Sequence, residues 1–319
     1  MDFREAIAQN NRRTKLVIVS FILLMLVVGL LADVAVSPAY PQSLAQSFIA
    51  LLTFQDTPFV TLIITIIAII GVFIVSKFGH KLMLSGNEFK ELKGEDSLPH
   101  EEKIVLNIVE EMAISAGLSY TPKAYIMETD TINAFAAGWN KKNAVIAVTR
   151  GLMEKLNRAE LQAVIAHETG HIIHGDSKLT LYIGILANVI VTFTNIFAHI
   201  AFFMRNGNNP AANQARLLII VLNLILPFIT QILYLYLSRK REYMADAAAV
   251  QLTGDNQAMI SALKKISGDH EQDADEERYV KHVSEHYRAA AYIYSKGDSI
   301  FSTHPSIENR LKELGDVGQ

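Results

Sequence analysis

Four long runs without Asp, Glu, Lys or Arg constrain this chain more than any other feature of its sequence. They cover residues 16–32, 59–75, 179–203 and 217–237, with lengths of 17, 17, 25 and 21 residues. A helix needs about 20 apolar residues to cross a bilayer, within a range of about 17–25. We therefore predict a mainly α membrane protein with four transmembrane helices and an α+β soluble part.

The second pair of runs is less apolar than the first pair. It contains Asn188, Asn195, His199, Asn223, Pro227 and Gln231. Polar residues inside a span usually face protein or a cavity rather than lipid, so a buried helical hairpin is the alternative for residues 179–237.

The first run has the position of a signal peptide, but its apolar core exceeds the usual length of about 7–15 residues. That length favours an uncleaved anchor.

The distribution of lysine and arginine predicts the orientation in the membrane. Four basic residues precede the first run: Arg4, Arg12, Arg13 and Lys15. Residues 33–58 have none, and basic residues are frequent again after the second and fourth runs. We predict an anchor over 1–75, a membrane hairpin over 179–237, and two cytoplasmic blocks over 76–178 and 238–319.

Charge and cysteine content exclude several classes of protein. The net charge of −3 does not fit a dedicated nucleic-acid binder, which would carry a basic excess. The chain has no cysteine, which excludes a disulfide framework, a thiol nucleophile and a cysteine-ligated metal. Any metal site must therefore consist of His, Asp and Glu side chains.

The two cytoplasmic blocks contain both helix and strand patterns. In the first block we predict a helix over 102–116, strands over 123–127, 134–137 and 144–149, and a helix that starts in a capping box at Asn157 and Glu160 and ends at Gly175. The last two strands are predicted to form a hairpin through the polar turn 140–143. In the second block we predict helices over 242–252, 257–266 and 305–314, with a solvated loop over 269–278.

Residues 167–171 read His-Glu-Thr-Gly-His inside a predicted helix. His167 and His171 lie one turn apart on one helical face, so both imidazoles can reach a single ion. Glu168 is then placed to take a proton from the attacking water. The alternative is a polar helix face that carries two unrelated histidines. Gly170 lies in mid-helix, where glycine is unfavourable, and therefore indicates the close approach of another helix.

A third ligand is needed, and two residues are candidates. His174 lies on the same stripe, but seven residues climb about 10.5 Å along a helix, which makes a structural role the better interpretation. Glu242 completes a His, His, Glu set of a type known in catalytic zinc sites. Asp246 lies one turn further and could hold a ligating imidazole. Glu242 could instead simply stabilise a helix N-terminus as a first-turn acid.

The motifs H-E-x-x-H at 167–171 and E-x-x-x-D at 242–246, separated by an apolar hairpin, resemble the HtpX-like membrane zinc metalloproteases, which are related to the CAAX-type prenyl proteases. Two further segments match this family: residues 133–138 and Thr303-His304-Pro305 followed by Arg310. The resemblance covers essentially the whole chain. It implies one Zn²⁺ per chain, gluzincin-type peptidase chemistry and a role in bacterial membrane-protein quality control.

The resemblance also implies roles for individual residues. The metal ligands would be His167, His171 and Glu242, with Glu168 as the catalytic base. The strand that includes Asn133, Ala134, Phe135 and Ala136 would pair with an extended substrate. His304 and Arg310 would lie near the site and stabilise the oxyanion.

Our prediction is a zinc-dependent endopeptidase of the bacterial inner membrane whose active site faces the cytoplasm. Its partners would be the lipid bilayer and membrane-protein or unfolded polypeptide substrates, with no nucleic acid. Three alternatives stay open. A site-2-type intramembrane protease would place the motif inside an apolar run, a zinc-binding scaffold would have no use for Glu168, and a zinc transporter would need ionisable ligands in several spans, where only His199 is so placed.

Overall fold

The computed structural model describes residues 3–36, 43–86, 88–94, 97–138, 141–203, 209–235, 239–272 and 305–315. The chain divides into two compact units. Unit 1 comprises residues 1–13, 77–184 and 234–319, and unit 2 comprises residues 14–76 and 185–233.

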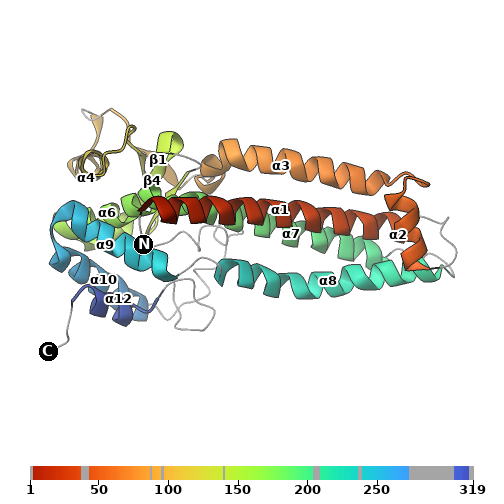
Figure 1. Cartoon of the computed structure of the whole chain (residues 1–319). Coiled ribbons are helices and arrows are strands. Elements are labelled where there is room, and N and C mark those ends of the chain that lie inside the picture. The colour runs from red at the N-terminus through yellow and green to blue at the C-terminus, as the bar shows by residue number, and fades with distance from the viewer. Residues whose placement is uncertain are drawn as a thin grey trace. The chain divides into compact units, whose positions relative to one another are not determined.

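Helices dominate the described chain (Figure 1). They are α1 (Phe3–Val36), α2 (Leu44–Leu52), α3 (Phe59–Met83), α4 (His100–Ser115), α5 (Arg150–Lys155), α6 (Arg158–His174), α7 (Asp176–Phe203), α8 (Pro210–Leu235), α9 (Arg239–Thr253), α10 (Asn256–Gln272) and α12 (Ile307–Glu313). The strands are β1 (Phe89–Glu91), β2 (Lys123–Met127), β3 (Ala134–Ala137) and β4 (Val145–Thr149).

Three helices in the described residues are long and apolar enough to cross a membrane by length and composition: Ile7–Val36, Phe59–Met83 and Asp176–Ile200. They contain or overlap the first three predicted runs. Residues 217–235 of the fourth run lie in α8, whose described apolar part, Pro210–Leu226, is shorter than these three helices. The fourth crossing therefore stays a prediction, while the mainly helical membrane architecture is confirmed.

Unit 2 holds a buried carboxylate at a helix end. Asp33, 6% exposed, accepts hydrogen bonds from the backbone N–H groups of Val60 and Thr61 at 2.9 and 2.8 Å. These groups lie in the first turn of α3, where helix N–H groups have no intrahelical partner. Gly29 lets the two helices approach, because a Cβ there would lie 2.7 Å from the Cα of Thr61. The carboxylate thus caps α3 and fixes it against α1.

Unit 1 contains a four-stranded mixed sheet with the order β1-β2-β4-β3. β2 and β4 are parallel, whereas β1 and β3 pair antiparallel with their neighbours. The predicted hairpin is confirmed, with Ala134 opposite Val148 and Ala137 opposite Val145. β1 was not predicted, because three residues are too few to show a period of two. β3 lies at one edge of the sheet, and all four of its residues are buried.

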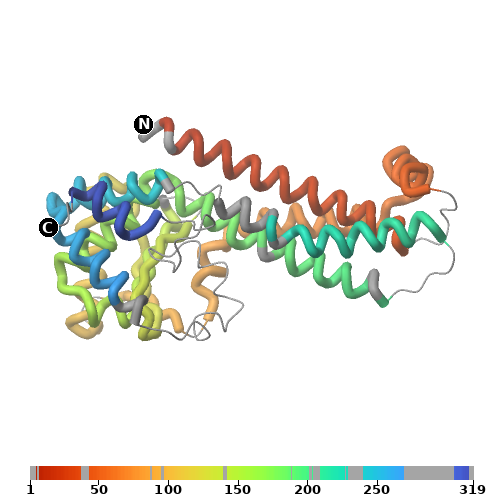
Figure 2. Tube along the Cα trace, turned by 90° about the horizontal axis from the view of Figure 1, so that it is seen from below, coloured from red at the N-terminus to blue at the C-terminus, as the bar shows by residue number. Residues whose placement is uncertain are grey.

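The helix α6 packs against this sheet and against α4, α9 and α10, and α12 packs against α9 and α10 (Figures 1 and 2). The capping box predicted at the start of α6 is confirmed. The Asn157 side chain accepts from the Glu160 backbone at 3.0 Å, and the Glu160 carboxylate accepts from the Asn157 backbone at 2.8 Å. Gly175 ends α6 in the left-handed conformation with φ 72°. The start and the end of this helix are therefore fixed by local sequence.

Two predictions in the second block were wrong at their boundaries. The last helix begins at Ile307 rather than Pro305, because the Ser306 side chain accepts from Asn309 N and acts as N-cap. α10 continues to Gln272, since residues 269–272 contain no helix breaker. The first part of the predicted acidic loop is therefore helical, and residues 273–278 lie outside the described residues.

Candidate metal centre

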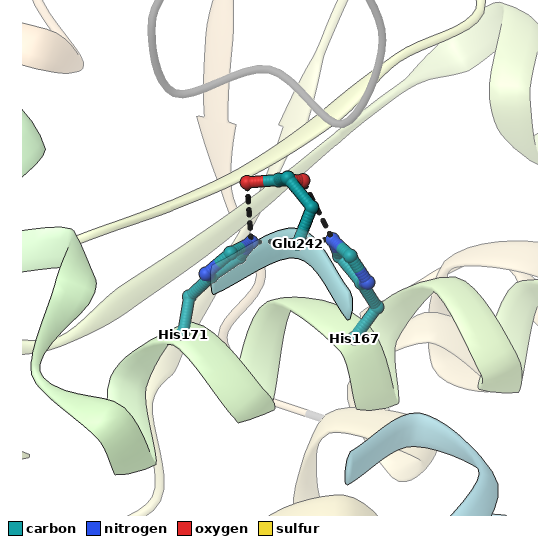
Figure 3. A group of neighbouring side chains, drawn as sticks. All are labelled: His167, His171 and Glu242. Carbon is teal, nitrogen blue, oxygen red and sulfur yellow. Dashed lines mark hydrogen bonds and ion pairs between the residues drawn. The ribbon is translucent and has the colours of Figure 1, made fainter. Parts of the chain in front are cut away.

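The three predicted metal ligands meet in unit 1. His167 and His171 rise from one face of α6, and Glu242, in the first turn of α9, points its carboxylate between them (Figure 3). Gly170 allows this approach, because a Cβ there would lie 3.1 Å from the Ala248 Cβ and 3.3 Å from the Ala245 Cα of α9. The predicted close helix contact at Gly170 is confirmed.

The donor atoms fit a zinc ion. His167 Nε2 and His171 Nε2 are 3.2 Å apart, and each lies 3.7 Å from an oxygen of Glu242. Ligands at about 2.0–2.1 Å from a tetrahedral zinc are about 3.3 Å from one another. The two 3.7 Å distances go to different oxygens of Glu242, and one ligand atom from each of the three residues lies within 4.8 Å of the other two, so the group could hold a Zn²⁺ ion.

Both histidines are oriented by a carboxylate. His167 Nδ1 lies 2.8 Å from Asp246 Oδ1, and His171 Nδ1 lies 3.2 Å from Asp176 Oδ2. When Nδ1–H donates to a carboxylate, the lone pair of Nε2 is left for a metal. Asp246 was predicted for this position, whereas Asp176 was missed. The available signal was an acid directly after the Gly175 helix end, five residues beyond His171.

Arg310 lies beside Asp246 and is 1% exposed. Its Nε and Nη2 donate to the two carboxylate oxygens at 2.9 and 2.6 Å. Burial alone would raise the pKa of Asp246, but the charge of Arg310 and the contact with His167 outweigh burial and lower that pKa to about 2. The guanidinium thus faces the carboxylate that orients His167, and its Nη2 lies 3.5 Å from His167 Nδ1. Its predicted role at the oxyanion stays a prediction. His304 lies outside the described residues.

Glu168 is the most isolated carboxylate of the site. Its side chain is 1% exposed, and neither oxygen forms a hydrogen bond with the described residues. Burial raises its pKa, against the lowering influence of His171, His167 and the Ala136 backbone. A carboxylate with a raised pKa accepts a proton more readily near neutral pH.

The predicted substrate strand packs against the helix that carries Glu168. Ala136 belongs to β3, which packs against α6, and its backbone interacts with the Glu168 carboxylate. Asn133, 1% exposed, precedes the strand, and its side chain accepts from Ala134 N at 3.0 Å.

The alternative third ligand, His174, is absent from the metal-ligand group among the described residues. Burial lowers the pKa of its ring.

Long apolar helices and a largely buried His, His, Glu site with an adjacent glutamate define the class of membrane-bound metalloproteases. Residues 99–317 match Peptidase family M48. A "Protease HtpX homolog" of Helicobacter acinonychis is 40% identical over 314 residues, which are 98% of both chains. Another from Listeria monocytogenes serotype 4b is 32% identical over 330 residues, covering 98% of this chain and 99% of that one. This chain belongs to peptidase family M48 and is a zinc metalloprotease of the HtpX type.

A solved structure is also similar. The crystal structure of S. mikatae Ste24p has a TM-score of 0.47 and 18% sequence identity, and the match covers 84% of this chain and 61% of that one.

Proposed function

We propose that this membrane protease is an endopeptidase that cleaves cytoplasmic segments of membrane proteins, including damaged ones, with Glu168 as its general base. The observation that carries the proposal is the buried Glu168 carboxylate, which is adjacent in sequence to the ligand His167, lies on a helix that packs against β3, and has a raised pKa. Neither oxygen of this carboxylate forms a hydrogen bond with the described residues, which leaves it available for proton transfer.

Each residue of the site has a distinct role in this proposal. His167, His171 and Glu242 would hold Zn²⁺, which supplies a Lewis acid for the scissile carbonyl and an activated water. Glu168 takes the proton of the attacking water and returns it to the leaving amine. Asp246 and Asp176 keep the two imidazoles in the required tautomer. The edge of the sheet at β3 offers main-chain groups to an extended substrate.

The side of the membrane follows from charge. Basic residues precede α1 and follow the second apolar run, and residues 33–58 contain none. This asymmetry supports an inner-membrane protein whose protease unit faces the cytoplasm. The quality-control role is supported by the resemblance of the motifs to the HtpX-like enzymes.

The decisive experiment compares the wild type with Glu168→Gln, both purified in detergent with chelator and then given zinc. We expect equal zinc content, and zinc-dependent self-cleavage and cleavage of an unfolded test protein in the wild type alone. Glu154→Gln, an exposed glutamate in α5, is the matched control and should retain activity. Equal zinc with no cleavage in the wild type would favour a metal-binding scaffold, and cleavage by Glu168→Gln would exclude Glu168 as the base.

A second experiment tests the orientation. Because the chain has no cysteine, single cysteines at the exposed positions Glu154 and Gln55 report sidedness. A membrane-impermeant maleimide should label Glu154→Cys only in inside-out vesicles and Gln55→Cys only in right-side-out cells. The reverse pattern would overturn the cytoplasmic placement.

A further inference from the structure

A buried chain of hydrogen bonds leads from the metal centre to the N-terminal helix. Asp176 orients His171 through Oδ2, and its other oxygen, Oδ1, accepts a hydrogen bond from Asn10 Nδ2 at 2.5 Å. Asn10 lies in α1, 166 residues before Asp176 in the sequence. Both side chains are buried, at 5% and 2% exposure. Polar groups buried in this way are held by their hydrogen bonds.

The amide of Asn10 contacts two elements at once. Its nitrogen carries two hydrogens, and besides Asp176 it contacts the main-chain oxygen of His174 at 3.2 Å. That carbonyl belongs to the last turn of α6. The carbonyl groups of a last helical turn accept no hydrogen bond within their own helix. Asn10 therefore fastens the end of α6 to the start of α7, the two elements that carry His171 and its orienting carboxylate.

The same carboxylate lies close to the third ligand's helix. Arg241 Nη1 is 3.7 Å from Asp176 Oδ1 and 3.4 Å from Thr180 Oγ1, and Arg241 directly precedes Glu242. Asp176 is thus surrounded by Arg241, by the ligand His171 and by Asn10. Arg241 is the residue next to the ligand Glu242. A shift of the Asp176 carboxylate would therefore change the orientation of the His171 imidazole.

We infer that Asn10 is a positioning residue for the zinc ligand His171 and acts through Asp176, so that the segment before the first apolar run is part of the metal centre. The inference rests on the zinc site of the proposed function. The adjacent residue Asn11 provides the contrast, because Asn11 is exposed and its side-chain oxygen accepts a hydrogen bond from the Lys178 amine at 3.2 Å, away from the metal ligands.

The test measures zinc affinity of the full chain in detergent by competition with a chromogenic chelator. Losing the orienting carboxylate in Asp176→Ala should weaken zinc binding about 10–100-fold. Losing one hydrogen bond to it in Asn10→Ala should weaken binding about three- to tenfold. Asn11→Ala, the same change one residue along, should stay within about twofold. The double variant Asn10→Ala/Asp176→Ala should bind like Asp176→Ala alone, because the two residues act in series.

A second readout separates positioning from general stability. The absorption spectrum of Co²⁺ in the site reports ligand geometry, and it should change in Asn10→Ala and remain as in the wild type in Asn11→Ala. If Asn10→Ala does not fold, Asn10→Leu keeps a side chain of comparable size and takes its place. Wild-type zinc affinity with an unchanged Co²⁺ spectrum in the Asn10 variant, or additive effects in the double variant, would overturn the inference. A wild type that binds no zinc would overturn the proposed function itself, so the two failures are distinguishable.

Discussion

The two sides of the metal centre hold their histidines in different ways. On one side His167, with 0% exposure, lies 2.8 Å from Asp246, and Arg310 holds that carboxylate with two hydrogen bonds. On the other side His171 lies 3.2 Å from Asp176, which accepts a hydrogen bond from the neutral amide of Asn10 at 2.5 Å. We call these the Asp246 side and the Asp176 side.

The two sides differ in how the negative charge of the buried carboxylate is compensated. Asp246 is enclosed by α9 and α12, where an unpaired charge would be costly, and a buried guanidinium compensates it. Asp176 lies in the first turn of α7, where the helix N-terminus itself favours negative charge. Its short hydrogen bond comes from the neutral Asn10 amide, and its nearest guanidinium, that of Arg241, is more distant at 3.7 Å. The Asp246 side should therefore govern folding stability, and the Asp176 side should govern metal affinity with a smaller effect on stability.

Removing Arg310 should have the largest effect on stability. Arg310→Met leaves Asp246 buried without its counter-charge, and breaking a buried ion pair in this way costs about 3–5 kcal/mol. The measurement is denaturant unfolding of the metal-free protein in detergent. Arg158→Met is the matched control, because Arg158 is 52% exposed in its pair with Glu111 and should cost less than about 1 kcal/mol. Similar losses in both variants would contradict the distinction between the two sides.

Features with a local signature could be predicted from the sequence. The capping box at Asn157, the end of α6 at Gly175 and the close contact at Gly170 each depend on a few neighbouring residues or on one unusual residue in a regular pattern. The ligand candidates His167, His171 and Glu242 were predictable because metal geometry restricts both residue type and spacing.

Features that depend on distant parts of the chain could not be predicted. Nothing near Asn10 or Asp176 indicates that they meet across 166 residues. The resemblance placed Arg310 near the site, but only the packing of α12 against α9 shows that its guanidinium faces Asp246. The start of α12 was misplaced because Pro305 and Ser306 are both plausible helix-start residues, and the cap interaction decides between them.

Replacing each carboxylate by its amide should separate the two sides by metal affinity. Asp246→Asn and Asp176→Asn preserve shape but can present an N–H group to the imidazole and favour the wrong tautomer. Such changes typically weaken metal binding about 10–100-fold. We expect the larger loss for Asp246→Asn, because its contact with histidine is shorter, 2.8 Å against 3.2 Å. Isothermal titration with zinc measures both, with Asp255→Asn, an exposed aspartate, as the control. Equal losses would show that contact distance does not rank the two sides.

The smallest effect is expected at Glu160, which supports α6 and therefore both sides equally. Its carboxylate, 3% exposed, accepts hydrogen bonds from Ser261 at 2.6 Å and Lys265 at 2.8 Å in addition to its capping contact. Burial would raise the pKa of Glu160, but these contacts outweigh burial and lower it. Glu160→Gln should cost about 1–2 kcal/mol at pH 7, with zinc affinity nearly unchanged.

The pH dependence of this cost follows from the sign of the shift. Because the folded pKa lies below the unfolded value of about 4.3, the ionised form stabilises the fold. That contribution is complete above the unfolded value and is lost as the pH falls through the folded pKa. Unfolding curves of wild type and Glu160→Gln should therefore separate at pH 7 and converge in acid, while Glu154→Gln follows the wild type throughout. A gap that persists in acid would mean that the charge of Glu160 is not what stabilises α6, and that the helix carrying both histidines depends on packing alone.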